Sequence, residues 1–121
     1  MTTALIVDDS RLSRMMVQAA IKEIRPEWLT IEASNSDDAL NKTQTQQSVD
    51  VIILDYNMPG ENGITLGVEL QQRYPNAFVS MLTANIQEST QRKAHDAGFT
   101  FFKKPVTKEL VTEIIETSGK S

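Results

Sequence analysis

Five short apolar runs lie along the chain, separated by longer and more polar segments. The runs are Ala4 to Val7, Trp28 to Ala33, Val51 to Leu54, Ala77 to Leu82 and Thr100 to Phe102. Apolar runs of about four to eight residues, bounded by turn-forming residues, are typical of strands that are covered on both faces. The pattern therefore predicts five buried strands with intervening helices.

The first intervening segment has an amphipathic pattern. Ser10 is suited to cap a helix that runs to about Ile24, before Pro26 ends it. We expect its two methionines to fill gaps in the core, because the methionine side chain adapts to irregular spaces. The apolar residues at helical spacing are Leu12, Met15, Met16, Ala19 and Ala20.

Four more helices are expected. The second is capped by Ser36 or Asn35 and runs to about residue 47, and its few apolar residues indicate a short or mobile helix. The third begins near residue 63 and ends before Pro75, and the fourth covers about 86–97, where Gly98 ends it. The apolar positions of the third and the last helix are Ile64, Leu66, Val68, Leu70, Val106, Leu110, Val111, Ile114 and Ile115.

Strands that alternate with helices in this way predict an α/β fold with helices on both faces of a parallel sheet. We expect a flavodoxin-like, doubly wound (βα)5 sandwich with its five strands in the order 2-1-3-4-5. The chain of 121 residues has the size of one domain, so we assign residues 1–121 to a single domain.

The composition argues against several classes of function. There is no cysteine, so disulfides, thiol catalysis and cysteine-bound zinc are excluded, and a reducing, cytoplasmic location is expected. A net charge of -4 without a basic block argues against direct binding to nucleic acid. No segment approaches the roughly 20 apolar residues of a membrane span, and we see no signal peptide.

Three carboxylates follow the first and third apolar runs. Asp8 and Asp9 come directly after the first, and Asp55 comes directly after the third. In the predicted strand order these two strands flank the switch point of the sheet, so the three side chains converge there. Crowded carboxylates need a compensating cation, and oxygen ligands suit Mg²⁺.

The ends of the last two runs carry groups that suit phosphoryl chemistry. Thr83 ends the fourth run and offers a hydroxyl, and Lys104 follows the fifth and offers a cation. An aspartate can act as the nucleophile toward phosphorus, while metal ions and cationic side chains neutralise the transferred charge. Alone, Lys104 and Thr83 are better explained as an ordinary surface lysine and an ordinary strand-end threonine, but together at successive strand ends these residues indicate a site.

These residues resemble the receiver domain of two-component response regulators of the chemotaxis type, over essentially the whole chain. The resemblance rests on motifs that occur in the family's order. They are Ile6-Val7-Asp8-Asp9-Ser10, Asp55-Tyr56-Asn57-Met58-Pro59 with Gly63, Thr83-Ala84, and Lys104-Pro105.

The resemblance implies a role for each matching position. Asp55 would accept a phosphoryl group from a phosphohistidine, and Asp8, Asp9 and Asp55 with the backbone carbonyl of Asn57 would bind Mg²⁺. Lys104 would pair with the phosphoryl group, and the peptide bond between Lys104 and Pro105 is commonly cis in the family. Thr83 would move toward the phosphoryl oxygen, and Phe101 would then turn inward as the switch aromatic.

Two assignments needed a choice between neighbours. Lys103 is a second candidate cation, but adjacent residues of a strand point to opposite faces, and Lys104 precedes the proline. Phe102 is a second candidate switch aromatic, but Phe101 stands three residues before the lysine. In addition, Asn57 and Asn85 lie at positions that resemble modulators of the dephosphorylation rate in the family.

The resemblance implies a signalling switch rather than a turnover enzyme. Its partners would be a sensor histidine kinase or a histidine phosphotransfer protein, and a downstream protein that docks where the fourth helix meets the fifth strand and helix. A monomer or a weak phosphorylation-dependent dimer is expected, and His95 is expected to be an ordinary surface residue.

Three other functions are less well supported. A carrier in a phosphorelay would use the same site. A small aspartyl-phosphate phosphatase would need an acid where Asn57 stands, and also a cap segment. A flavin mononucleotide carrier would need a hydroxyl-rich loop where the chain has Asp8 and Asp9, which repel phosphate.

Overall fold

The computed structural model describes residues 1–58, 62–84 and 87–121. It contains a parallel sheet with strands in the order β2-β1-β3-β4-β5, which confirms the predicted fold class and strand order. The strands are β1 (Thr3–Val7), β2 (Leu29–Ala33), β3 (Val51–Asp55), β4 (Phe78–Thr83) and β5 (Thr100–Lys103). The helices are α1 (Arg11–Ile24), α2 (Ser36–Lys42), α3 (Gly63–Arg73), α4 (Glu88–Asp96) and α5 (Lys108–Ser118). Pro59 and Asn85, which carry two of the sequence predictions, lie outside the described residues.

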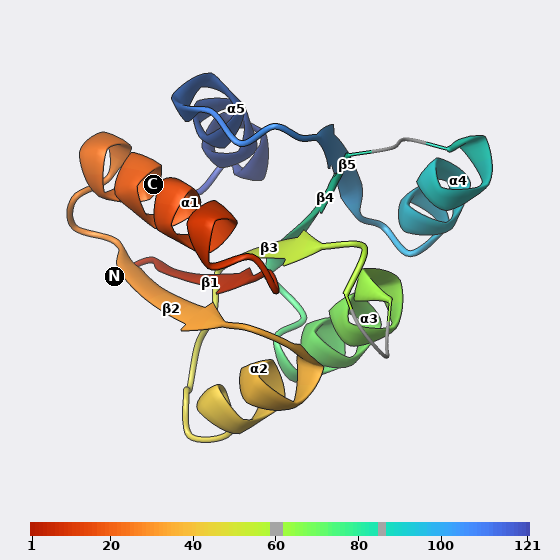
Figure 1. The fold of residues 1–121 in the computed structure, drawn as a ribbon. Helices are drawn as coiled ribbons and strands as arrows, with labels where there is room; N and C mark the ends of the chain where they lie inside the picture. Colours follow the sequence, from red (N-terminus) through yellow and green to blue (C-terminus); the bar gives the residue numbers. More distant parts are fainter. Residues whose placement is uncertain (59–61, 85–86) are drawn as a thin grey trace.

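Helices cover both faces of the sheet (Figure 1), with α1 and α5 on one face and α2, α3 and α4 on the other. Alternate strand residues point to opposite faces. On β3, for example, Ile52 and Leu54 belong to the α3 side, and Val51 and Ile53 belong to the α1–α5 side. The sheet thus separates two hydrophobic clusters.

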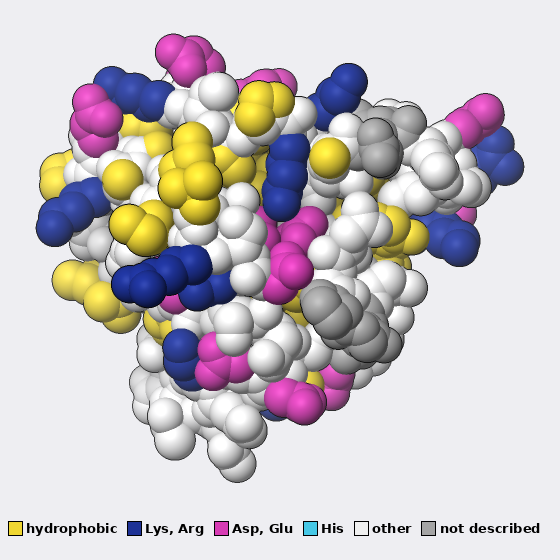
Figure 2. Space-filling model, in the orientation of Figure 1, with side chains coloured by type: hydrophobic (Ala, Val, Ile, Leu, Met, Phe, Trp, Pro, Cys, Tyr) yellow, Lys and Arg dark blue, Asp and Glu magenta, His cyan; other side chains and the backbone are white. Residues whose placement is uncertain are grey.

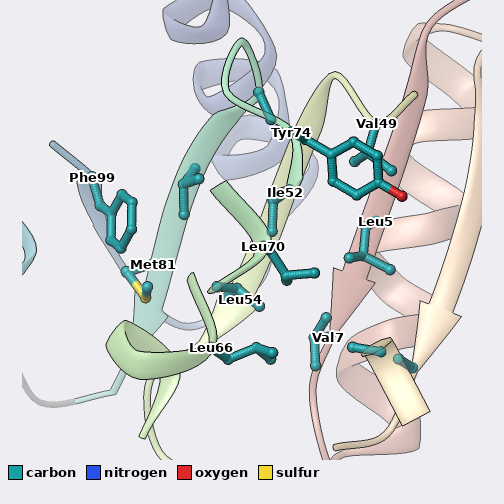
Figure 3. Close-up of a cluster of buried hydrophobic side chains, with 14 of the residues drawn as sticks. Leu5, Val7, Val49, Ile52, Leu54, Leu66, Leu70, Tyr74, Met81 and Phe99 are labelled. Carbon is teal, nitrogen blue, oxygen red and sulfur yellow. The ribbon is translucent and has the colours of Figure 1, made fainter. Parts of the chain in front are cut away.

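The cluster on the α3 side packs the strands against the helix (Figure 3). Leu66 and Leu70 of α3 are fully buried against Leu54 and its neighbours, and Tyr74 closes the cluster. The Tyr74 hydroxyl donates to the backbone carbonyls of Thr43 and Gln46. That contact pins the segment after α2 to the end of α3.

The second helix ends earlier than predicted. It stops at Lys42, because the following residues are polar or β-branched and offer no apolar face. Thr43 instead turns its hydroxyl back onto the carbonyl of Ala39 at 2.7 Å. Of the two candidate caps, Asn35 is the one that accepts a backbone N–H, from Asp38.

The prediction that the methionines of α1 fill the core is wrong. The face that packs on the sheet consists of Val17, Ala20 and Ile21, as the prediction for Ala20 required. Met15 and Met16 are 53% and 42% exposed. On α3, likewise, Val68 is exposed rather than buried. Helical spacing alone does not say which of two apolar stripes faces inward.

The two ends of the chain meet at the edge of the sheet where the strands begin. The hydroxyl of Thr2, just before β1, donates to the carbonyl of Ser121 at 2.7 Å. The ammonium group of Lys120 donates to the carbonyl of Asn76, just before β4. Both ends therefore lie opposite the carboxyl ends of the strands.

Candidate functional site

Three carboxylates meet at the carboxyl edge of the sheet. Asp8 follows β1 and Asp55 is the last residue of β3, and these two strands are hydrogen-bonded neighbours. One carboxylate oxygen each from Asp8, Asp9 and Asp55 lies within 4.8 Å of the others. Asp8 and Asp55 are buried, whereas Asp9 is exposed. Figure 2 shows acidic side chains gathered near the centre of this face.

Lys104 lies directly against the two buried carboxylates. Its ammonium nitrogen is 3.1 Å from Asp8 Oδ2 and 3.5 Å from Asp55 Oδ1. Burial alone would lower the pKa of Lys104, but the hydrogen bond to Asp8 and the charges of Asp55 and Asp8 outweigh it and raise that pKa. Lys103, the last residue of β5, is exposed. The structure thus brings Lys104, of the two candidate lysines, to the carboxylates.

The surroundings of Asp55 disfavour its ionised form. Burial, the adjacent charge of Asp8 and a hydrogen bond with Asp9 raise the pKa of Asp55 to about 7, although Lys104 and the Asn57 N–H act in the opposite direction. A divalent cation would relieve this repulsion. The donors are hard carboxylate oxygens, which fit Mg²⁺ and do not fit a soft metal.

Asn57 and Thr83 lie beside the Asp55 carboxylate. The backbone N–H of Asn57 donates to Asp55 Oδ1 at 3.3 Å, and its side-chain amide donates to the Thr83 hydroxyl at 3.5 Å. Thr83 ends β4 and is fully buried. Its hydroxyl is thus held within the site by a side chain from the neighbouring loop.

The two phenylalanines of β5 point to opposite faces of the sheet. Phe101 is half-buried and packs against the cluster on the α3 side, together with Ala97 at the end of α4. Phe102 is buried in the cluster on the α1–α5 side. Of the two, Phe101 is therefore the one on the face of the sheet that α4 covers. The Lys104-Pro105 peptide bond is cis.

Gly63 packs on the backbone of Asp55. A Cβ at this position would lie 2.6 Å from the Asp55 carbonyl oxygen, closer than any real contact of that kind. The N–H of Gly63 donates to the Tyr56 carbonyl at 2.9 Å, and Asn62 caps α3 by accepting from Thr65. The sequence indicated a loop here but not this close approach.

Arg14 also belongs to the site, although the sequence pattern did not indicate it. Its guanidinium donates to the backbone carbonyl of Asp8 at 2.6 Å. A signal was present: α1 has basic residues and no acidic residue in its first turn, which is unfavourable at the positive end of the helix dipole. His95, by contrast, is exposed on α4 and remote from the carboxylates, as expected.

The sheet and the acidic edge are those of a receiver domain, and the chain belongs to the response regulator receiver domain family, whose model matches residues 4–116. The family places it within two-component signalling. A similar protein is the chemotaxis protein CheY of Thermotoga maritima, which is 32% identical over 96% of both chains. The structure of chemotaxis protein CheY4 of Vibrio cholerae is also similar, with a TM-score of 0.85 and 27% identity over 98% of both chains.

Other relatives are far longer than this chain. A hybrid signal transduction histidine kinase L of Dictyostelium discoideum is 26% identical over 97% of the chain, which spans only 7% of that protein. A cyclic di-GMP phosphodiesterase of Thermotoga maritima is 31% identical over 90% of the chain, which spans 28% of it. Related domains thus occur within proteins of different activities. Within the described residues, no helix is long and apolar enough to cross a membrane.

Proposed function

We propose that the chain is a phosphorylation-activated switch in which Asp55 accepts a phosphoryl group from a phosphohistidine. The donor would be a sensor histidine kinase or a histidine phosphotransfer protein. The observation that carries this proposal is the buried Asp55 carboxylate, with the carboxylates of Asp8 and Asp9 within 4.8 Å and the Lys104 ammonium at 3.5 Å.

In the proposed reaction an Asp55 carboxylate oxygen attacks phosphorus. A P–O bond to Asp55 forms, the P–N bond to the histidine breaks, and the imidazole leaves with the electron pair and is protonated. Asp8, Asp9, Asp55 and the carbonyl of Asn57 would hold Mg²⁺, which when bound neutralises charge on the carboxylates and on the phosphoryl oxygens. Lys104 would pair with the phosphoryl group, and the Thr83 hydroxyl would donate to one of its oxygens.

An apolar groove beside the site supports the assignment of a protein donor. Leu12 and Met16 of α1 and Pro105 and Val106 after β5 line a groove of about 410 Å³, and Lys104 forms part of its wall. Leu12 is 67% exposed. Because Lys104 also contacts Asp55, a protein that fills this groove reaches the acceptor carboxylate. We assign the groove to the phosphohistidine-bearing partner.

The output would be a change at α4, β5 and α5, where a downstream protein would dock. Thr83 and Phe101 would connect the acceptor to that surface: Thr83 adjoins Asn57, and Phe101 lies on the face of the sheet that α4 covers. Chemistry of this kind is slow and self-limited, so the chain would act as a signalling protein rather than as a turnover enzyme.

Intact mass after incubation with acetyl phosphate tests the proposal. We expect one added phosphoryl group on the wild type that requires Mg²⁺ and is absent from Asp55→Asn. Lys104→Met should slow its formation at least tenfold, whereas Lys103→Met, a matched change at the exposed neighbour, should not. An adduct that persists in Asp55→Asn would overturn the proposal.

The wild type could lack an adduct because hydrolysis is fast. A beryllofluoride titration separates this case from loss of function, because a fast-hydrolysing switch still binds the phosphoryl mimic. Absence of both the adduct and beryllofluoride binding would refute the assignment of Asp55 as an acceptor.

A further inference from the structure

Arg14 connects the acidic turn to the edge strand of the sheet. Its Nη1 donates to the Asp8 carbonyl at 2.6 Å, and its Nε lies 3.4 Å from a carboxylate oxygen of Glu32 on β2. The Arg14 side chain is only 15% exposed. The backbone of Glu32 is held in the sheet opposite Ile6 of β1, and its carbonyl also accepts from Lys42 at 2.7 Å. The guanidinium fork therefore joins a strand to the turn after β1.

The carbonyl that Arg14 binds belongs to the peptide unit between Asp8 and Asp9. Orienting this peptide unit sets the direction from which both side chains leave the backbone. Asp8 is further restrained, because its carboxylate accepts from the Ser10 N–H at 2.8 Å and from Lys104. Asp9 is exposed and lies next to the bond that Arg14 makes. Apart from its hydrogen bond with Asp55, the placement of the Asp9 side chain depends on the peptide orientation.

We propose that Arg14 is a positioning residue for the cation site: by bridging Glu32 and the Asp8 carbonyl it holds Asp9 in place to bind Mg²⁺. The proposal rests on the proposed function, which makes these carboxylates the metal ligands. Residues that orient metal ligands typically change metal affinity by about 10- to 100-fold when they are replaced. Because Arg14 acts through the backbone, we expect an effect near the lower end of that range.

Electrostatics alone predicts the opposite sign. A guanidinium near the site repels a divalent cation, so its removal should tighten Mg²⁺ binding if charge were its only influence. Removal of Arg14 also leaves the negative charge of Glu32 without its ion-pair partner, which adds to the attraction of Mg²⁺ to the site. A loss of affinity in an Arg14 variant therefore cannot come from its charge and must come from positioning.

The test is isothermal titration of the full chain with Mg²⁺. We expect Arg14→Met to weaken binding about tenfold, and Arg14→Lys, which keeps the charge but lacks the two-pronged donor, to weaken it about threefold. Arg11→Met is the matched control, since Arg11 is exposed, lies on the same helical turn and lines the same depression as Arg14. It should leave binding unchanged or slightly tighter.

A second readout is the Mg²⁺ dependence of phosphorylation by acetyl phosphate. The concentration of Mg²⁺ at half-maximal rate should rise in Arg14→Met and Arg14→Lys, while the rate at saturating Mg²⁺ changes less than twofold. A variant that is merely misfolded would lose the saturated rate as well. If Arg14→Met does not fold, Arg14→Lys decides, because charge alone predicts no change for it.

The outcomes separate the two proposals. Unchanged or tighter Mg²⁺ binding in both Arg14 variants overturns the role of Arg14 and leaves the proposed function intact. A wild type that binds Mg²⁺ but neither takes up a phosphoryl group nor binds beryllofluoride overturns the proposed function, and the titrations still decide on Arg14. A wild type that binds no Mg²⁺ overturns both.

Discussion

Among the single residues of the site, Asp55 is the one whose charge is most opposed by its surroundings. Burial and the charge of Asp8 raise the pKa of Asp55 to about 7, from 3.8. A carboxyl group whose pKa is raised on folding stabilises the fold below its unfolded pKa, and that contribution is lost as pH rises through the folded pKa. Without a cation, Asp55 thus lowers stability progressively between about pH 4 and pH 7.

The first prediction is that Asp55→Asn is more stable than the wild type at pH 7.5 in EDTA, by on the order of 2 kcal/mol. The gain should shrink toward pH 4, where the aspartate of the folded wild type is protonated. Urea unfolding followed by the fluorescence of Trp28 measures this, because the indole is buried. Asp96→Asn, on the exposed end of α4, should show no comparable gain. Equal stability of Asp55→Asn and the wild type at pH 7.5 would refute the destabilising charge.

The second prediction concerns Gly63. Gly63→Ala should destabilise the fold by about 1–3 kcal/mol and slow phosphorylation, because the added methyl group must displace the Asp55 backbone. Gly67→Ala is the contrast: its methyl group meets the side chains of Phe99 and Met81 and not the backbone of Asp55. It should cost stability and leave phosphorylation intact. Urea unfolding and acetyl phosphate uptake measure the two effects, and a normal rate in folded Gly63→Ala would contradict the explanation.

The acidic residues of the site could be predicted because their position relative to a strand end is a local property of the sequence. Asp55 terminates an apolar run, and parallel strands bring such ends together. The contacts of Gly63 and Arg14 could not be predicted in this way. Gly63 packs on the carbonyl of Asp55, and Arg14 donates to the carbonyl of Asp8. Every residue has a backbone carbonyl, so the sequence does not indicate which one will be contacted.

At the scale of elements, α1 has two apolar stripes. Val17, Ala20 and Ile21 pack on the sheet, whereas Leu12 and Met16 are exposed and line the groove beside Lys104. Both stripes have helical spacing, so the sequence pattern did not distinguish them. The distinction comes from α5, which packs beside α1 on the same face and fixes how the helix is rotated.

The third prediction separates the two stripes. Ile21→Ala should cost about 2–5 kcal/mol of stability, because Ile21 is fully buried. A double change of Leu12→Ser and Met16→Ser, the two α1 residues that line the groove, should change stability little, since both side chains are exposed. It should, however, slow phosphoryl transfer from a phosphohistidine-bearing protein at least tenfold and leave uptake from acetyl phosphate unchanged.

Val68→Ser is the control for the outward stripe, because Val68 is an exposed apolar residue on α3. It should leave transfer from both donors unchanged. Equal rates from the protein donor for wild type and the double variant would exclude the groove beside α1 as the donor surface.

For the molecule as a whole, the central question is how phosphorylation of Asp55 would change the surface of α4 and β5. Thr83 ends β4, and the registered partner of Met81 on β5 is Phe101. A phosphoryl group that draws the Thr83 hydroxyl would shift the balance between two arrangements of this region, because it interacts differently with each. In the proposed function, Thr83 would thus be the step between charge at the site and packing at α4.

The fourth prediction is that Thr83→Ala binds beryllofluoride but loses most of the response in 88–104. Backbone amide chemical shifts measure it. In the wild type, shifts should change over α4 and β5 and remain small over α2, which packs on the opposite end of the sheet. A full response in Thr83→Ala would show that the signal leaves the site by another route.

The fold was predictable to the level of strand order, because alternating strands and helices leave few arrangements of a parallel sheet. The length of α2 was not, since its end is decided by Thr43 and by the contact of that segment with Tyr74. Local propensity describes where a helix is allowed, and tertiary contacts decide where it stops.

The meeting of Thr2 and Ser121 has a consequence for how such a domain is combined with others. Because the ends are joined by one hydrogen bond, a host protein would need only a short connection to receive the domain inside one of its own loops. The junction would lie across the sheet from Asp55, so neither an inserted nor a circularly permuted form would crowd the acceptor.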